Sequence, residues 1–206
     1  MIVIFFTKLQ EKLPPLPEEE YLKLLSPELC KKNETYKFWE DGHWLFDSNN
    51  DILNAIQYNN YKRPMLDGEL DFNISYSKNH IVSAIAKNIK VGIDVENYTP
   101  IDFNDFKKIM NADHWKIIHD SEQPIQTFFD FWTIKESISE ADDRRIYANE
   151  ILENKARIDD NTWQLKLLHL FENASLCVAP DKESSIKLLE VNFYNNETLK
   201  KSSVKT

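Results

Sequence analysis

The chain has 206 residues, of which 42% are hydrophobic and 29% charged, and its net charge is −9 at pH 7. This hydrophobic content supplies a buried core and excludes an intrinsically disordered chain. The acidic balance argues against nucleic acid as a partner, because sequence-independent binding to DNA or RNA requires Lys and Arg side chains that neutralise phosphates. Cys30 and Cys177 are too few for a disulfide framework, and the apolar start of "MIVIFFTKLQ" is too short for a signal peptide or a membrane span. We therefore expect a cytoplasmic protein without membrane association.

The first part of the chain contains predicted strands and helices. Residues 2–7 predict a buried strand, and three helices are expected, over residues 18–25, from Ser26 toward Trp39, and over residues 51–58. Three strand-like runs follow, "DFNISYS", "HIVSAIA" and "KVGIDVE", joined by short polar turns. Their close spacing predicts an antiparallel meander.

The second part of the chain is predicted to contain helices followed by strands. Helical periodicity resumes in "IDFNDFKKIM", and the strongest predicted helix covers residues 126–145, "QTFFDFWTIKESISEADDRR". Alternating patterns in "TWQLKLLHLF" and "ASLCVAP" then predict strands, and a frayed, flexible tail is expected after about residue 195. The order of elements predicts an α+β protein with an N-terminal half, residues 1–97, and a C-terminal half, residues 98–206.

The stretch "VGIDVE" places two carboxylates in an otherwise apolar strand. Asp94 and Glu96 point to one face because side chains two apart on a strand share a face, whereas Ile93 and Val95 face the core. Adjacent carboxylates repel each other, so either both are solvated at a strand end or a cation lies between them. Oxygen ligands of this kind suit Mg²⁺, which takes one or two protein carboxylates together with water and substrate phosphate. Gly92 in such a strand often marks the close approach of a ligand or another backbone.

A second motif, "FWTIKES", places Trp132 and Glu136 on one face of the long predicted helix. Taken in order, "FNISYS", "VGIDVE" and "WTIKES" resemble the signature of the Sfp-type 4'-phosphopantetheinyl transferases. Weaker similarity covers "LSPELCKKNETYKFWEDGH" and "ASLCVAP", so that the resemblance extends from about Ser26 to Pro180. Each motif alone is weak, but the ordered combination is specific.

The resemblance implies a pseudo-twofold pair of similar α/β halves with coenzyme A in the cleft between them. By residue-for-residue match, it implies that Asp94, Glu96 and Glu136 bind Mg²⁺ and that Ser75 binds the phosphates of the coenzyme. In this family a carrier-protein serine attacks the β-phosphate of coenzyme A, with a carboxylate at the Glu136 position as base and Lys135 offsetting the developing charge. The implied partner is an acyl or peptidyl carrier protein, and the chain is expected to act as a monomer.

Several positions depart from the family pattern. Tyr76 replaces a coenzyme-binding histidine, Trp44 replaces a phosphate-binding arginine, and Glu140 replaces a lysine. Arg63, in "YKRP", and Arg144, after Glu140, are candidates to hold the coenzyme phosphates instead. The metal triad is therefore kept, while much of the phosphate clamp is changed.

Three hypotheses follow from these motifs. The first is an active transferase with an altered coenzyme clamp. The second is a catalytically silent relative that binds a carrier protein or another biosynthetic partner, as the changes at Tyr76, Trp44 and Glu140 suggest. The third is an unrelated metal-binding or structural α+β protein.

Overall fold

The computed structural model describes residues 1–8, 56–60, 63–66, 68–142, 144, 150–152, 154–190 and 200–203. The helices predicted over residues 18–25, from Ser26 toward Trp39 and over 51–55 lie outside these residues, as does Trp44. Ile56–Tyr58, predicted to end a helix, instead forms strand β2, which pairs antiparallel with β3, Pro64–Leu66. That part of the helix prediction is therefore wrong, because the pairing with β3 decides the local structure.

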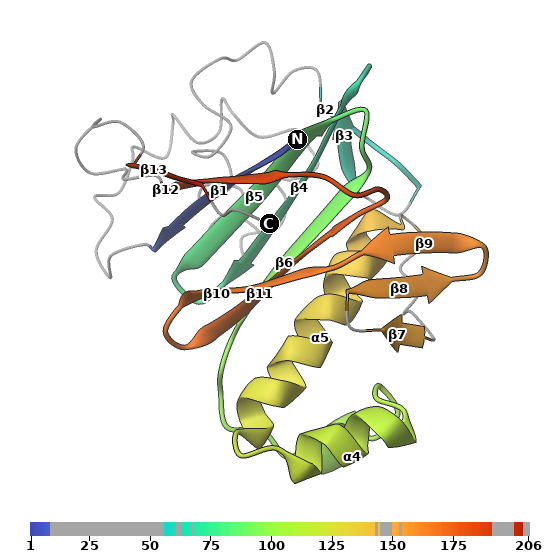
Figure 1. Cartoon of the computed structure of the whole chain (residues 1–206), viewed down its shortest axis with the longest axis vertical. Coiled ribbons are helices and arrows are strands. Elements are labelled where there is room, and N and C mark those ends of the chain that lie inside the picture. Colours follow the sequence, from blue (N-terminus) through green and yellow to red (C-terminus); the bar gives the residue numbers. More distant parts are fainter. Residues whose placement is uncertain are drawn as a thin grey trace, which may run out of the picture.

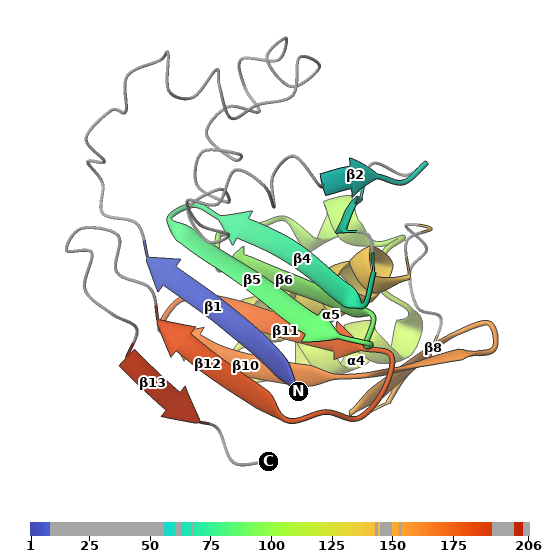
Figure 2. The ribbon, with the colours of Figure 1, turned by 90° about the horizontal axis from the view of Figure 1, so that it is seen from above.

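A five-stranded sheet joins the beginning and the end of the chain (Figure 2). Its order is β13 (Lys200–Ser203), β12 (Ile186–Glu190), β1 (Ile2–Lys8), β5 (His80–Lys87) and β4 (Leu70–Ser77). Strand β1 is parallel to β12 and antiparallel to β5. The strand predicted over residues 2–7 is thus confirmed. Residues 200–203, which were expected in a frayed tail, form β13 and pair with β12.

A second, three-stranded sheet has the order β10 (Lys166–Phe171), β11 (Ala174–Pro180) and β6 (Val91–Asn97). The strands predicted from "DFNISYS", "HIVSAIA" and "KVGIDVE" are confirmed as β4, β5 and β6. The predicted meander is wrong, because β6 pairs with β11 and not with β5. Turn length and alternation could not show that the chain changes sheets after β5.

The second sheet lies between the first sheet and helix α5, Pro124–Ala141 (Figure 1). On β6, Val91, Ile93 and Val95 are fully buried in a core shared with the first sheet. On β11, the opposite face contributes Cys177 and Ala179 to a second core, which includes Ile134 and Ile138 of α5. The predicted inward orientation of Ile93 and Val95 is therefore confirmed, and the opposite face of β6 is directed toward α5.

Helix α5 confirms the strongest helix prediction, although it ends at Ala141 and not at residue 145. Pro124 occupies its first turn, where a missing N–H costs nothing. The helix predicted over residues 101–110 is only a 3₁₀ turn, η2 (Phe103–Phe106), followed by helix α4 (Ala112–Asp120). The elements η2, α4 and the start of α5 share an aromatic core around Phe128.

The two-stranded β2–β3 sheet and a small three-stranded sheet complete the described structure, the latter formed by β7 (Glu150–Leu152), β8 (Lys155–Ile158) and β9 (Asn161–Gln164). In the described residues, the sheets together with helices α4 and α5 agree with the predicted α+β class. The first sheet combines β1, β4 and β5 of the predicted N-terminal half with β12 and β13 of the C-terminal half. No helix in the described part of the chain is long and apolar enough to cross a membrane.

Candidate functional site

Helix α5 touches the backbone of β6 at Gly92. A Cβ atom built on Gly92 would lie 1.9 Å from the carbonyl oxygen of Ser137 and 2.6 Å from the amide nitrogen of Ala141. Both distances are far below van der Waals contact, so only glycine permits this approach. Of the two sequence-based interpretations of Gly92, the close approach of another backbone is the one that the structure shows.

The other end of the contact between α5 and β6 is formed by Glu96. The indole Nε1 of Trp132 donates a hydrogen bond to Glu96 Oε1 at 3.2 Å, and the Ser77 hydroxyl donates to Glu96 Oε2 at 3.0 Å. Burial raises the pKa of Glu96, and these two hydrogen bonds partly oppose the rise. Glu96 is therefore fixed in orientation by α5 on one side and β4 on the other.

Asp94 lies between these two contacts and is only 8% exposed. The Ser75 hydroxyl donates to Asp94 Oδ1 at 2.8 Å, whereas Oδ2 is buried and has no hydrogen-bond partner in the described structure. The pKa of Asp94 is raised well above its ordinary value, first by burial and then by the charge of Glu96, with smaller contributions from Glu136 and Glu140. The interpretation of solvated strand-end carboxylates is therefore wrong for Asp94.

The register of α5 along β6 places Glu136 near Asp94. Trp132 meets Glu96 at one end of the contact, and Ala141 meets Gly92 at the other. From Trp132 to Ala141 the helix rises roughly 14 Å, and from Gly92 to Glu96 the strand rises roughly 13 Å. The two elements thus run antiparallel over matching lengths, so that Glu136 lies at the level of Asp94.

Side chains of β4 form a row of hydrogen bonds to the free edge of β6, which we call the β4–β6 seam. Four backbone amides of β6 donate to side chains of β4. The amide of Val91 donates to Asp71 Oδ2 at 2.8 Å, and that of Ile93 donates to Asn73 Oδ1 at 2.7 Å. The amide of Val95 donates to Ser75 Oγ at 3.1 Å, and that of Asn97 donates to Ser77 Oγ at 3.0 Å. The seam satisfies an edge that would otherwise leave backbone donors buried and unpaired.

The β4–β6 seam was not predicted from the sequence. The sequence pattern that indicates the seam is the alternation of polar and larger side chains within "DFNISYS". The polar residues are Asp71, Asn73, Ser75 and Ser77, and between them lie Phe72, Ile74 and Tyr76. Strand alternation puts all four polar side chains on one face. That face also carries Val82 and Ala84 of the neighbouring strand β5, which pair with Ser75 and Asn73 and are buried in the core. Polar residues that share a buried face predict hydrogen bonding to another element.

Ser75 and Tyr76 were both predicted to bind the coenzyme, and the structure places them on opposite faces of β4. Ser75 Oγ holds Asp94 and the amide of Val95. Tyr76 is 49% exposed and points to the other face. Only Ser75 of these two is brought to the carboxylates.

The two arginines predicted to hold phosphate are engaged within the protein. Arg63 is buried and forms two hydrogen bonds with Asp71, both at 2.9 Å, and a third with the carbonyl of Val91, also at 2.9 Å. The Arg144 guanidinium donates to Asp142 at 2.6 and 3.0 Å and to Asp159 at 2.9 Å. Arg63 thus braces the start of the seam, and Arg144 links the end of α5 to the β8–β9 turn.

Lys135 is buried in α5, at 4% exposure, and its pKa is lowered by burial. The pKa of His114 in α4 is lowered first by burial and second by the charge of Lys135. The ring of His114 stacks on Phe131 with centroids 4.4 Å apart. Successive helical residues are about 100° apart. Lys135 therefore projects from a different side of α5 than Glu136.

The side chains of the described residues do not form a ready-made metal site, since no three His, Cys, Asp or Glu groups among them converge at metal-ligand geometry. The electrostatic effect of Glu96, Glu136 and Glu140 on Asp94 nevertheless shows that the carboxylates are neighbours. A buried carboxylate oxygen without a hydrogen-bond donor fits a cation ligand chemically. The residues present therefore fit Mg²⁺ if the Glu side chains turn toward Asp94.

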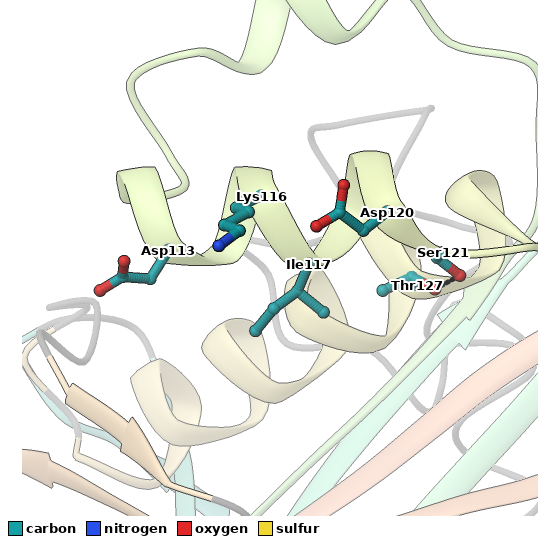
Figure 3. A pocket seen from close by; sticks show the side chains of 6 residues that line it. All are labelled: Asp113, Lys116, Ile117, Asp120, Ser121 and Thr127. Carbon is teal, nitrogen blue, oxygen red and sulfur yellow. Dashed lines mark hydrogen bonds between the residues drawn. The ribbon is translucent and has the colours of Figure 1, made fainter.

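Two pockets lie near α4, away from these carboxylates. One has a volume of about 640 Å³ and is lined by α4 residues, including Lys116 and Ile117, and by Thr127 of α5 (Figure 3). The other, of about 550 Å³, is lined by residues that include Phe103, Trp115 and His119. Neither pocket includes Asp94, Glu96, Glu136 or Glu140 among its lining residues.

Comparison with known proteins agrees with the motifs at this site. Residues 90–179 match the model of the 4'-phosphopantetheinyl transferase superfamily. The chain is also 34% identical, over 118 residues, to the 4'-phosphopantetheinyl transferase gsp of Aneurinibacillus migulanus. That match covers 56% of this chain and 47% of the relative, about half of its length. Strands β6 and β11 and helix α5 all fall within the matched region, so this part of the chain is similar to the 4'-phosphopantetheinyl transferase superfamily.

Proposed function

We propose that this protein transfers the 4'-phosphopantetheine group of coenzyme A to a serine of an acyl or peptidyl carrier protein, with Mg²⁺ as the cofactor. Support comes from the superfamily match over residues 90–179 and from the relative named as a 4'-phosphopantetheinyl transferase. The carboxylates on β6 and α5 lie within the matched region and supply the chemical groups that this reaction requires.

The observation that carries the proposal is the environment of Asp94. This carboxylate is buried, one oxygen has no hydrogen-bond partner in the described structure, and Glu96 and Glu136 are its electrostatic neighbours. Such an arrangement is unfavourable without a cation, because burial and like charges both disfavour the ionised form. A purely structural carboxylate would be expected to have donors on both oxygens.

We assign Asp94, Glu96 and Glu136 to the cation. When bound, Mg²⁺ supplies positive charge to the pyrophosphate of coenzyme A. The Trp132 and Ser77 hydrogen bonds fix Glu96, and the Ser75 hydroxyl fixes one oxygen of Asp94 so that the other is directed to the ion. Ser75 thus acts on the coenzyme phosphates through Asp94.

Glu136 is proposed as the base in the transfer. Its carboxylate accepts the proton of the carrier serine, directly or through water, while the serine oxygen forms a bond to the β-phosphorus. The bond between that phosphorus and the leaving phosphate oxygen breaks, and 3',5'-ADP departs with its electron pair. Lys135 is proposed to offset charge near the transferred group. Its burial beside His114 suggests that it does so at a distance, from within α5.

Mass spectrometry of an apo carrier protein tests the proposal directly. Incubation with the protein, coenzyme A and Mg²⁺ should add one phosphopantetheine group, and omission of Mg²⁺ should prevent the addition. Glu136→Gln should slow transfer by about 100-fold or more, the usual contribution of a general base. Glu122→Gln is the matched control, since Glu122 is an exposed residue of the turn before α5.

A silent, partner-binding relative is the second candidate. It is favoured by the ion pairs of Arg63 with Asp71 and of Arg144 with Asp142, which commit two predicted phosphate-binding residues to internal contacts. Binding of the carrier protein without any mass increase, over a range of carriers and divalent cations, would establish this candidate and refute the first.

We also infer that the protein works in the cytoplasm as a monomer. The buried free thiol of Cys177 suits a reducing compartment. Cell fractionation and light scattering measure these two properties.

A further inference from the structure

Glu140 lies beside the carboxylates of β6, although a lysine was expected at its position. The Asn73 side-chain amide donates to Glu140 Oε2 at 3.4 Å, while Asn73 Oδ1 accepts from the amide of Ile93. One Asn side chain therefore links Glu140 of α5 to the backbone of β6, directly before Asp94.

The β4–β6 seam places Glu140 and Asp94 on adjacent positions. Asn73 contacts Glu140, and Ser75, two residues further along β4, contacts Asp94. Residues two apart on a strand share a face and are separated by roughly 7 Å. On α5, Glu140 follows Glu136 by one helical turn, so both glutamates lie on the face that meets β6.

An independent observation points to a ligand for this group of acids. Asp94 is more than nine-tenths buried, and its Oδ2 has no hydrogen-bond partner in the described structure. The other Asp94 oxygen is directed by Ser75. A buried oxygen of this kind, with Glu96, Glu136 and Glu140 as electrostatic neighbours, fits a cation ligand.

We propose that Glu140 is a fourth carboxylate of the Asp94 site and that the site consequently binds a divalent cation before coenzyme A is present. Mg²⁺ at phosphate-transfer sites is usually held by one or two protein carboxylates and by the substrate phosphates. In this protein the negative charge of Glu140 replaces negative charge that the substrate phosphates would otherwise supply to the cation. The inference rests on the proposed function for the identity of the ion, Mg²⁺ or its spectroscopic substitute Mn²⁺.

Titration of the coenzyme-free protein with Mn²⁺, followed by electron paramagnetic resonance of the free ion, tests the proposal. The unmodified protein should bind Mn²⁺, and Glu140→Gln should weaken that binding roughly tenfold, equivalent to about 1.4 kcal/mol. Glu122→Gln, which removes the same charge from an exposed position, should bind as the unmodified protein does. Equal affinities for all three proteins would overturn the proposal.

Thermal unfolding separates a cation ligand from a structural role. Without cation, Glu140→Gln should raise the melting temperature, because it relieves repulsion among carboxylates, and it should reduce the increase caused by Mn²⁺. A purely structural Glu140, acting through Asn73, would give the opposite result, a lower melting temperature and an unchanged response to Mn²⁺. Glu140→Asp retains the charge and should keep more of the Mn²⁺ response than Glu140→Gln.

Failure of the transferase proposal and failure of the proposed role of Glu140 give different experimental results. Mn²⁺ binding without coenzyme A, in a protein that never modifies a carrier, would refute the transferase proposal and leave the role of Glu140 intact. Transfer activity in a protein that binds Mn²⁺ only together with coenzyme A would refute the role of Glu140 and leave the transferase proposal intact.

Discussion

At the scale of single residues, Gly92 sets the distance between α5 and β6. Its missing side chain lets the turn from Ser137 to Ala141 rest on the strand backbone. Glu136 and Glu140 belong to this part of α5, so the same contact sets their distance from Asp94. The absence of a side chain at Gly92 thus sets the distance between Asp94 of β6 and the two glutamates of α5.

Gly92→Ala should therefore destabilise the protein strongly. The added Cβ would meet two backbone atoms, at 1.9 and 2.6 Å, which cannot rotate away as a flexible side chain could. We expect a loss of about 3 kcal/mol or more in the free energy of unfolding, at or above the usual range for overpacking. Urea denaturation measures it. Gly68→Ala is the comparison: Gly68 has φ +104° but open space around it, so only backbone strain of about 1–2 kcal/mol is expected. Equal losses for both variants would contradict the close approach.

Asp94 should give the stability of the cation-free protein a distinctive dependence on pH. Its folded-state pKa lies well above the ordinary value of 3.8, because of burial first and the charge of Glu96 second. The unfolded chain releases this proton at lower pH than the folded protein does, so that between the two pKa values the free energy of unfolding falls as pH rises. The contribution of Asp94 is therefore fully present below the unfolded pKa and is lost toward the folded one.

The variant Asp94→Asn isolates this effect. Urea denaturation of both proteins across acidic and neutral pH, in the presence of a chelator, should show that the unmodified protein loses stability relative to the variant as pH rises. Saturating Mn²⁺ should reduce the difference, since a cation favours the ionised carboxylate. A difference that stays constant with pH would contradict the raised pKa.

At the scale of elements, the β4–β6 seam joins two sheets without a backbone ladder. Alternate side chains of β4 act as acceptors for alternate amides of β6, and three of them, Asn73, Ser75 and Ser77, also donate to acids of the candidate site. The seam therefore has two functions, since it closes the edge of the second sheet and orients Asp94, Glu96 and Glu140.

Replacement of Asn73 by Ala should expose the cost of breaking this seam. The variant leaves the buried amide of Ile93 without its acceptor, and an unsatisfied buried donor costs about 1–3 kcal/mol. It should also increase the hydrogen-exchange rate of that amide. Tyr76→Phe is the control on the same strand, because Tyr76 lies on the opposite face and is half exposed. If the two variants were equally stable, the seam would not contribute as described.

The sequence predicts elements better than it predicts how they join. The strands around Asn73 and Asp94 and the long helix containing Glu136 follow from local periodicity, which the chain carries residue by residue. The change of sheet after β5 and the parallel pairing of β1 with β12 depend on contacts between distant segments, on which local patterns carry no information. For the candidate site, spacing predicted that Asp94 and Glu96 share a face, but only the packing of α5 on Gly92 shows that Glu140 joins them.

At the scale of the whole molecule, the two predicted halves exchange strands. Strand β6 of residues 1–97 pairs with β11, and β12 of residues 98–206 pairs with β1. Side chains from both sheets, such as Ile4, Ile93 and Leu188, share one buried core. Each half thus contributes strands to a sheet that the other half completes.

We accordingly expect that neither half folds alone. A fragment of residues 1–97 would keep the pairing of β1 with β5 but lose β12, the second partner of β1, and β11, the partner of β6. A fragment of residues 98–206 would keep the β10–β11 and β12–β13 pairs but lose β6 and β1. Circular dichroism and amide exchange of each fragment should show little protected structure, and mixing the two should restore it. Independent, cooperative unfolding of either fragment would show instead that the halves are separate domains.

The parallel pairing of β1 with β12 also has a consequence for synthesis on the ribosome. Strand β1 leaves the exit tunnel long before Ile186–Glu190, the strand that covers one of its edges. Until then β1 can be paired only on the side of β5, and its apolar sequence "IVIFF" presents an open edge. Because segments distant in the chain pair slowly, this edge stays open for some time even after Ile186–Glu190 has been made. The nascent protein should therefore depend on chaperones that bind apolar strands, and its yield should fall when they are depleted.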